Sequence, residues 1–246
     1  MDFGQFQTYL SATETVVTLG SGLFAGVTAS TRLRRAPHRR VWRLSDPAGL
    51  KICAATSAIT DTGRYKRAST GVGQVRALAT VAHSLRTGYK RANVRDIVLS
   101  TDFHPTMYAC DLILLGGSKN NAVTEQVLAA LYENTGFRFS PDDPNAIEFN
   151  GETLEGQHDS GQVKHDIATF LAHDNPFCEG KRVFVISGSH TFGTAAAARL
   201  AVDCLSRKMF SLPRRFLSLA DVSVDGEQDA RLSNIRTHKF EPFNYG

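Results

Sequence analysis

The sequence predicts an α/β protein with a mostly parallel sheet. After residue 50, short apolar runs alternate along the chain with segments of helical periodicity, and strands that alternate with helices pair in parallel and are covered on both faces. Within residues 146–156, Asn-Gly at 150–151 separates two short segments of alternating polarity, which is typical of a β-hairpin. These two observations predict a Rossmann-like three-layer fold with an antiparallel hairpin insertion.

Continuous apolar runs indicate the strands, because a strand that is buried on both faces carries apolar residues at successive positions. The clearest run reads DLILLGG and spans residues 111–117. Further strands are expected at 50–56, 95–101, 163–173, 181–188 and 214–226, the last of which turns at Asp225-Gly226 into a second hairpin.

Helical periodicity indicates three helices, at 71–89, 121–134 and 193–207. Asn121 is expected to cap the second helix and Gly136 to end it. A run of alanines near the start of the third helix would let that helix pack closely against the sheet.

The composition is that of an ordinary globular chain. Its 246 residues, 42% hydrophobic and 21% charged, suit one domain with a substantial core. The net charge of +4 is too small to indicate nucleic acid as a specific partner. The four cysteines form no CxxC pair and the histidines do not share a strand face, so no metal site is predicted and no cofactor is identified. Thiols in a reducing cytoplasm are expected.

Residues 1–46 are expected to form a helix-like segment and a basic linker that precede the main α/β domain, residues 47–246. Residues 15–31 carry no charge, and a run rich in arginine follows them. The stretch is short and rich in Thr, Ser and Gly for a membrane span, and Asp2 and Glu14 precede it, unlike the basic start of a signal peptide. We expect residues 10–31 to pack on the protein or to lie at a membrane surface. If they span the membrane, the arginines place the main domain in the cytoplasm.

Ligands of open α/β sheets bind at the carboxyl ends of the strands, so three turns that follow expected strands are candidate sites. The first, residues 57–73, places basic side chains and glycines before a helix, where exposed amides and the helix dipole attract anions. A solvated basic loop is the alternative. The candidate ligand-binding residues of this turn are Arg64, Lys66, Arg67, Thr70, Gly71 and Gly73.

The second turn follows the clearest strand and offers amide and hydroxyl groups at the start of a helix. Its candidate ligand-binding residues are Gly116, Gly117, Ser118, Asn120 and Asn121. Glu125 lies in the first turn of the helix that follows, where a carboxylate complements the helix dipole. The alternative, which we favour less, is a catalytic carboxylate aimed into the ligand cleft.

The third turn, residues 188–194, is rich in glycine and hydroxyl groups. It lacks the lysine of a P-loop, because Phe192 precedes Gly193 and Thr194 follows it, and a P-loop NTPase is therefore disfavoured. His190 could act as a general base or a ligand donor, although a single loop histidine more often does neither. The candidate ligand-binding residues are Gly188, Ser189, His190, Thr191, Gly193 and Thr194.

The segments at 67–78, 111–131 and 175–200 resemble a bacterial Rossmann-like family with short N-terminal hydrophobic segments. This resemblance supports the fold and implies no activity. A looser likeness is to nucleoside deoxyribosyltransferases and TIR-type NAD-cleaving domains, which place a glutamate on a helix that follows a central strand. That likeness implies a catalytic role for Glu125.

Two functions follow as alternatives. Donor-rich turns without a coherent catalytic set favour a nucleotide- or nucleoside-binding sensor or regulatory domain. The alternative is an enzyme that cleaves the N-glycosidic bond of a nucleoside or an NAD-like dinucleotide, with Glu125 at the anomeric carbon. A dehydrogenase is disfavoured, because no GxGxxG follows the first strand. The expected partners are a nucleotide-like small molecule, further copies of the chain in a homo-oligomer, and a membrane surface or protein at the N-terminal segment.

Overall fold

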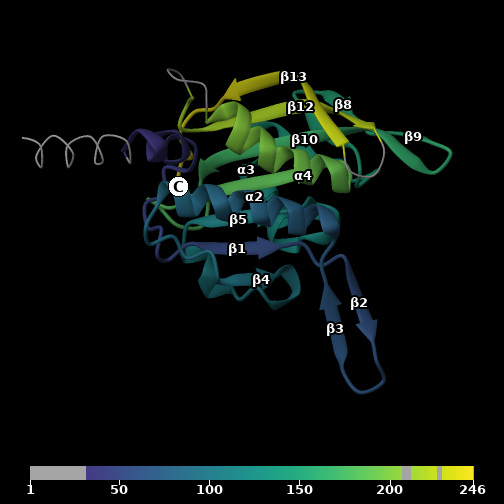
Figure 1. Cartoon of the computed structure of the whole chain (residues 1–246), viewed down its shortest axis with the longest axis horizontal. Helices are drawn as coiled ribbons and strands as arrows, with labels where there is room; N and C mark the ends of the chain where they lie inside the picture. Colours follow the sequence, from purple (N-terminus) through teal and green to yellow (C-terminus); the bar gives the residue numbers. More distant parts are fainter. Residues whose placement is uncertain (1–31, 207–211, 226–228, 246) are drawn as a thin grey trace, which may run out of the picture.

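The computed structural model describes residues 32–206, 212–225 and 229–245. Within these residues the chain forms a mixed α/β structure around an eight-stranded sheet (Figure 1). The strand order is β13-β12-β10-β11-β5-β1-β4, and the short strand β9 pairs with β10. Residues 15–31 lie outside the described part of the chain.

One half of the sheet is parallel, as the apolar runs predict. It contains β1 (Lys51–Ala54), β4 (Ile97–Leu99), β5 (Leu112–Leu115) and β11 (Arg182–Gly188). Every residue of β5 and β11 is buried, which explains why both strands appear in the sequence as continuous, mainly apolar runs.

The other half of the sheet is antiparallel, so the expectation of a mostly parallel sheet holds for only part of it. It contains β9 (Gln157–Asp159), β10 (Gln162–Asp174), β12 (Phe216–Asp225) and β13 (Asp229–Lys239). The turn from β10 to β11 spans only residues 175–181, whereas a parallel connection needs a dozen residues or more. The short turn therefore imposes the antiparallel pairing.

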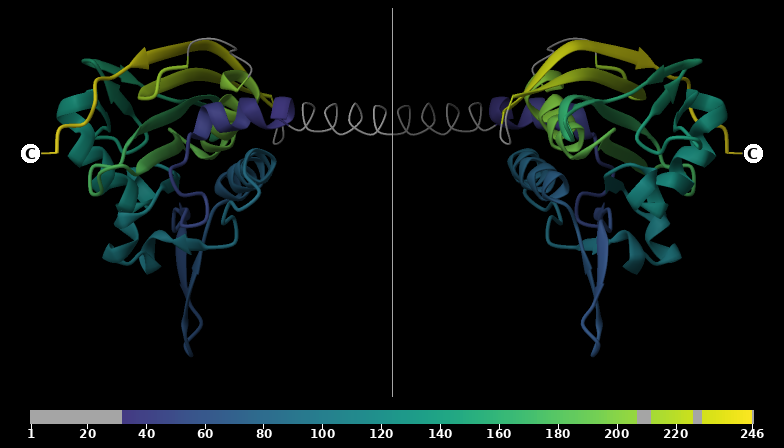
Figure 2. Two further views of the ribbon diagram at one scale, coloured as in Figure 1. Left: turned by 90° about the vertical axis from the view of Figure 1, so that its left-hand side faces the viewer. Right: turned by 90° about the vertical axis from the view of Figure 1, so that its right-hand side faces the viewer.

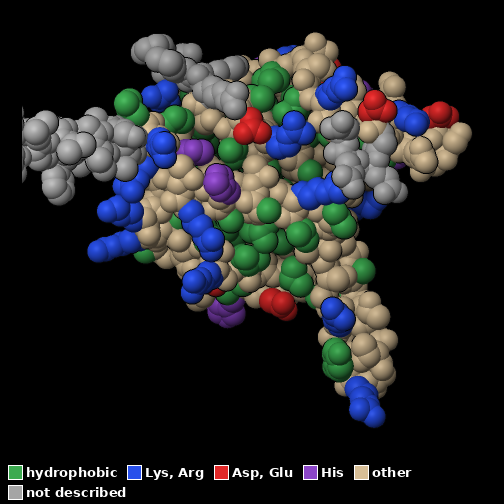
Figure 3. All heavy atoms as spheres, viewed as in Figure 1, with side chains coloured by type: hydrophobic (Ala, Val, Ile, Leu, Met, Phe, Trp, Pro, Cys, Tyr) green, Lys and Arg blue, Asp and Glu red, His purple; other side chains and the backbone are tan. Residues whose placement is uncertain are grey.

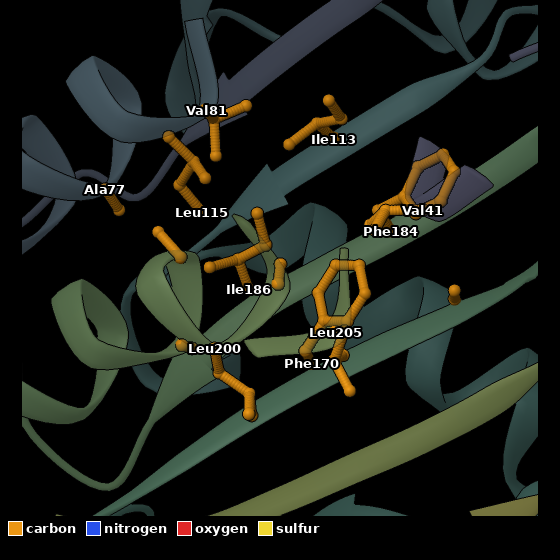
Figure 4. Close-up of a cluster of buried hydrophobic side chains, with 14 of the residues drawn as sticks. Val41, Ala77, Val81, Ile113, Leu115, Phe170, Phe184, Ile186, Leu200 and Leu205 are labelled. Atoms are coloured by element: carbon orange, nitrogen blue, oxygen red, sulfur yellow. The ribbon is translucent and has the colours of Figure 1, made fainter. Parts of the chain in front are cut away.

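Two apolar clusters cover the two faces of the sheet. Ile113 and Leu115 belong to one cluster and Leu112 and Leu114 to the other, because successive residues of a strand point to opposite faces. The first face is covered by α2 (Val72–Gly88), α4 (Thr191–Arg199) and the π-helical segment Leu200–Leu205 (Figure 4).

The opposite face is covered by α3 (Ala122–Thr135) and a small antiparallel sheet. That sheet contains β6 (Phe137–Phe139), β7 (Ile147–Phe149) and β8 (Glu152–Leu154). The hairpin predicted at Asn150-Gly151 joins β7 to β8, with φ of 52° and 82° at the two turn residues. A turn with positive φ at both central residues selects Asn-Gly, so this prediction is confirmed.

The predicted ends of α3 are also confirmed. The Asn121 side chain accepts hydrogen bonds from the amides of Val123 and Thr124, and Gly136 ends the helix in the left-handed conformation at φ 61°. Three short 3-10 segments connect the remaining elements. They are Ser100–Asp102, Pro105–Ala109 and Ser118–Asn120.

The basic N-terminal run forms a helix, and the end of this helix packs into the main core. Residues 32–42 are helical, and the ring of Trp42 is fully buried against Phe170 and Phe184, at centroid distances of 5.7 and 5.3 Å. The carbonyl of Trp42 accepts a hydrogen bond from Arg182 at 3.1 Å. In the described ranges, no helix has both the length and the apolar character that crossing a membrane requires.

A two-stranded hairpin projects from the body after β1 (Figures 1 and 2). It consists of β2 (Ala58–Asp61) and β3 (Lys66–Ser69), and its residues are almost all exposed. Gly63 turns the chain at φ 77°. The strands are short and polar and contact little else, so the sequence pattern alone indicates a loop here.

Candidate functional site

Two adjoining cavities lie where β5 and β11 end, beside the second and third turns that the sequence predicts as ligand sites. The inner cavity has a volume of about 220 Å³ and the outer one about 590 Å³. Lys119, Phe139 and Pro144 line both. The remaining inner residues are Gln74, Gly117, Asn120, Asn145, Gly188, Ser189, His190, Thr191 and Thr194. The remaining outer residues are Ser118, Glu125, Leu128, Ala129, Tyr132, Arg138, Ser140 and Pro141.

The turn from β5 to α3 forms one wall, and its two glycines have no substitute. Gly116 adopts φ 101°, a region that favours glycine, and a Cβ there would lie 2.7 Å from the Cβ of Ala55. A Cβ on Gly117 would lie 2.5 Å from the ring of Phe139. Both positions are therefore required for the cavity wall and its aromatic lining.

The turn from β11 to α4 forms the facing wall and is equally tight. A Cβ on Gly188 would lie 2.4 Å from the Cα of Gly193, and a Cβ on Gly193 would lie 2.3 Å from the carbonyl oxygen of Ile167. The strand β10 thus lies in backbone contact with the start of α4. This contact brings Asp166 beneath the turn.

Asp166 occupies the N-terminus of α4. Its side chain is fully buried, and its carboxylate accepts hydrogen bonds from the amides of His190 at 2.9 Å, Gly193 at 2.5 Å and Ile167 at 2.8 Å. Amides at the start of a helix are available to bind anions unless another group satisfies them. Here a carboxylate of the protein itself satisfies two of them.

A chain of ionisable groups runs from Asp166 toward β9. The Nδ1 atom of His190 lies 3.5 Å from the Asp166 carboxylate, and its Nε2 atom lies 2.9 Å from Nε2 of His158. A Cβ on Gly156 would lie 2.6 Å from the His190 ring, so the β8–β9 connection also packs against this ring. The His190 side chain is thereby held at one edge of the inner cavity.

Three residues of the inner lining carry a buried polar atom without a hydrogen-bond partner in the described structure: His190, whose Nδ1 lies 3.5 Å from the Asp166 carboxylate, Gln74 and Ser189. Gln74 is 8% exposed and Ser189 is 6% exposed, yet Oε1 of Gln74 and Oγ of Ser189 make no hydrogen bond. A buried polar group without a partner costs about 1–3 kcal/mol. A ligand in the inner cavity that hydrogen bonds to both atoms would recover that cost.

The structure brings the second and third predicted turns together, and only the hairpin part of the first turn lies away from them, since Gly73 at the end of the first turn packs on Thr191. Ser118 lines the outer cavity, and Gly117 and Asn120 line the inner one with the 188–194 turn. From the first turn, Thr70, Gly71 and Gly73 lie at the start of α2, where the hydroxyl of Thr70 is buried without a partner. The basic residues of this turn, Arg64, Lys66 and Arg67, lie on the projecting hairpin and line neither cavity.

The structure shows where the predicted residues Asn121 and Glu125 lie and what their side chains contact. Asn121 is fully buried and caps α3, and its side chain also donates to the carbonyl of Leu115. Glu125 is exposed in the first turn of α3 and lines the outer cavity. Its carboxylate position therefore suits both the helix dipole and the cleft, the two alternatives that the sequence leaves open.

Several lining residues were not singled out from the sequence. Phe139, Asn145 and Arg138 follow α3 in the insertion, and Gln74 lies one residue past the predicted glycines. Asp166 lies on β10, more than twenty positions before His190 and Gly193, whose amides donate to its carboxylate. The nearest available signal is an acidic residue directly before the apolar run that starts at Ile167, since a carboxylate buried in a strand requires donors.

Arg138 is held in place at the outer cavity. Its guanidinium donates to Glu148 at 2.6 Å and lies 4.8 Å from the centre of the Tyr132 ring. Hydrogen bonds from Ser140 and Arg138 lower the pKa of Glu148. The outer cavity thus combines an aromatic ring, a fixed cation and the free carboxylate of Glu125.

Comparison with known proteins assigns no relative: no family model and no curated protein matches the chain. Function is therefore argued from the two cavities.

Proposed function

We propose that this protein is a nucleoside- or nucleotide-binding sensor or regulatory domain, with the ligand in the two adjoining cavities. The observation that carries the proposal is the pair of buried, unpartnered oxygen atoms on residues that line the inner cavity, Oε1 of Gln74 and Oγ of Ser189. Polar groups that converge in a cavity at the carboxyl ends of strands are the usual elements of a small-molecule site.

The dimensions and lining of the cavities suit the two parts of such a ligand. Their combined volume falls within the range of about 300–1,000 Å³ typical of small-molecule sites. The outer cavity offers Tyr132, Leu128 and the guanidinium of Arg138 to a flat base. The inner cavity offers hydroxyl and amide groups to a sugar.

We also propose that the sheet is a Rossmann-like variant in its parallel half. The chain passes from β1 outward to β4 and then returns to place β5 and β11 on the other side of β1. Such a reversal is the topological switch point at which α/β proteins bind ligands. Gln74 follows β1 and Gly117 follows β5, which agrees with a ligand at this point.

The proposal is tested by thermal-shift and calorimetric titration of the full chain with nucleosides and nucleotides. We expect at least one of these ligands to raise Tm, because a ligand that binds the native state stabilises it. Ser189→Ala should weaken that ligand about fivefold through loss of one hydrogen bond of about 1 kcal/mol.

Ser69→Ala, on the exposed hairpin, is the matched control and should leave the affinity unchanged. If no nucleoside or nucleotide shifts Tm or binds in the calorimeter, the proposal fails.

A second candidate is cleavage of an N-glycosidic bond, and the position of Glu125 in the outer cavity favours it. A carboxylate can stabilise or attack the developing cation at the anomeric carbon. Chromatography of products released from NAD and common nucleosides tests this. If the reaction occurs, Glu125→Gln should lower turnover by orders of magnitude with little change in ligand affinity.

Glu133→Gln, exposed on the same helix, serves as the control and should retain full turnover. Should Glu125 act on the helix dipole alone, Glu125→Gln costs about 0.3–1 kcal/mol of stability and leaves any turnover intact.

For the partners of the whole molecule, we propose that the end opposite the cavities contacts an anionic membrane surface. The helix of residues 32–42 lies at this end, beside the C-terminus of α2, since the Arg39 guanidinium donates to the carbonyl of Gly88 at 2.8 Å. Figure 3 shows Lys and Arg side chains gathered there. Exposed basic residues of this end are Arg32, Arg34, Arg39, Arg86, Lys90, Arg91 and Arg95.

A further inference from the structure

We propose that the inner cavity accepts an uncharged sugar and rejects a phosphate, so that the ligand is a nucleoside rather than a nucleotide, and that Asp166 sets this specificity. The inference rests on the proposed function and narrows it to one ligand class. Three features of the cavity carry it: the occupied start of α4, the distribution of cations, and the hydrogen-bonding needs of the unpartnered atoms.

The start of α4 already holds a carboxylate. In a phosphate site at a helix N-terminus, the ligand's oxygens accept from the first amides of the helix. Here the amides of His190 and Gly193 donate to Asp166 at 2.9 and 2.5 Å. A phosphate in the inner cavity would have to replace these bonds or lie beside a buried group of like charge, which disfavours it.

Most of the cations that could offset this charge lie outside the inner cavity. Arg64, Lys66 and Arg67 lie on the projecting hairpin and line neither cavity. Among the inner-cavity residues, Lys119 alone has an ammonium or guanidinium group, and that group donates to the side chain of Asn145 at 3.2 Å. The ring of His190 lies between protein groups, with Nε2 at 2.9 Å from His158 and Nδ1 at 3.5 Å from Asp166.

The unpartnered oxygen of Gln74 needs a ligand that donates. Oε1 of Gln74 is a carbonyl oxygen, which can only accept a hydrogen bond. A phosphate dianion offers acceptors alone and leaves this atom unsatisfied. A sugar hydroxyl donates to Gln74 and can also exchange a hydrogen bond with the hydroxyl of Ser189. The chemistry of the buried pair therefore matches a neutral polyol.

Calorimetric titration of the full chain compares adenosine, guanosine, cytidine and uridine with their 5′-monophosphates and with inorganic phosphate. We expect one nucleoside to bind about tenfold or more tightly than its monophosphate, since like charges brought together without compensation cost several kcal/mol. The nucleoside affinity should hardly change between low and high salt, because no net charge of the ligand is involved. Inorganic phosphate should not bind.

Asp166→Asn tests the cause of the preference. The variant removes the charge at the start of α4 and should move the affinity ratio toward the monophosphate by about tenfold. Asp159→Asn, which removes an exposed carboxylate of β9, is the matched control and should leave the ratio unchanged. If Asp166→Asn fails to fold, Ser189→Ala replaces it as the test: it should weaken the nucleoside about fivefold through loss of one hydrogen bond and leave the weaker binding of the monophosphate unchanged, and an equal loss for both ligands would overturn the sugar assignment.

The outcomes separate this inference from the proposed function. Tighter binding of a monophosphate than of its nucleoside, with affinity that falls as salt rises, overturns the sugar assignment and leaves nucleotide binding standing. A nucleoside preference that Asp166→Asn does not reduce overturns the role of Asp166. Binding of neither class overturns both proposals.

Discussion

Two buried aspartates show how single residues divide the molecule into a structural end and a ligand end. At the amino ends of the strands, Asp111 accepts from the hydroxyl of Ser45, the amide of Asp46 and the amide of Arg182. At the carboxyl ends, Asp166 accepts from the amides that begin α4. Both carboxylates satisfy buried donors, but only the second lies beside a cavity with unpartnered atoms.

The residue whose ionisation should matter most for stability is His173, on β10. Its ring is fully buried, with Nε2 at 2.8 Å from the Asn134 side chain. Burial lowers the pKa of His173 to about 4 from its ordinary 6.5, against the smaller opposing effect of Asp174. As the pH falls from 6.5 toward 4, His173 therefore binds a proton in the unfolded chain but stays neutral in the folded protein.

We accordingly predict that the free energy of unfolding is highest above pH 6.5 and falls by about 3 kcal/mol between pH 6.5 and 4 through this one group. His173→Gln keeps a hydrogen-bonding side chain and removes the titration. Urea unfolding at several pH values should show the difference between the wild type and the variant change across this window. Parallel curves from pH 7 to 4 would contradict the assignment.

At the scale of elements, the sequence predicts what local patterns encode. The buried runs of β5 and β11, the cap at Asn121 and the Asn-Gly hairpin are each written in adjacent residues. The pairing of β10 between β11 and β12 is not, since it depends on which strands meet across the sheet. The same limit applies to the site: the turns at Gly117 and Gly188 are visible in the sequence, whereas Asp166 reaches its partners only through tertiary contact.

The crossing of α2 over the start of α4 is the element contact that shapes the inner cavity. A Cβ on Gly73 would lie 2.2 Å from the carbonyl oxygen of Thr191. Gly73→Ala must therefore separate the two helices, and we predict a loss of at least about 1–3 kcal/mol in the free energy of unfolding, as for other overpacked contacts. Ligand affinity should fall as well, because Thr191 lines the cavity.

Gly88→Ala, at the other end of α2, is the control for this change. Its Cβ would meet the Cβ of His38 at 3.1 Å, and alanine favours a helix over glycine by up to about 1 kcal/mol. Urea denaturation should therefore show at most a small change for Gly88→Ala. Equal losses for the two variants would mean that the α2–α4 crossing is no tighter than the rest of the helix.

At the scale of the whole molecule, the basic helix of residues 32–42 and the cavities lie at opposite ends of the sheet. The strands β1, β5 and β11 run from the basic end to the cavity end (Figure 1). The uncharged stretch 15–31 precedes the basic helix in the sequence. A membrane at the basic end would leave the cavities facing away from it and open to ligand.

This arrangement predicts salt-dependent binding of the full chain to anionic vesicles through the basic end. Each basic residue near a surface that contains anionic lipid contributes about 1 kcal/mol, so sedimentation with phosphatidylserine vesicles should exceed that with phosphatidylcholine vesicles. Reversing the charge of Arg86, Lys90 and Arg91 to glutamate should abolish the difference. The control is the same charge reversal at Arg64, Lys66 and Arg67 on the projecting hairpin. It changes the net charge of the protein by the same amount and should have little effect on vesicle binding. If both triple variants lose binding to the same extent, net charge rather than the basic end governs the interaction, and the proposed orientation of the molecule is wrong.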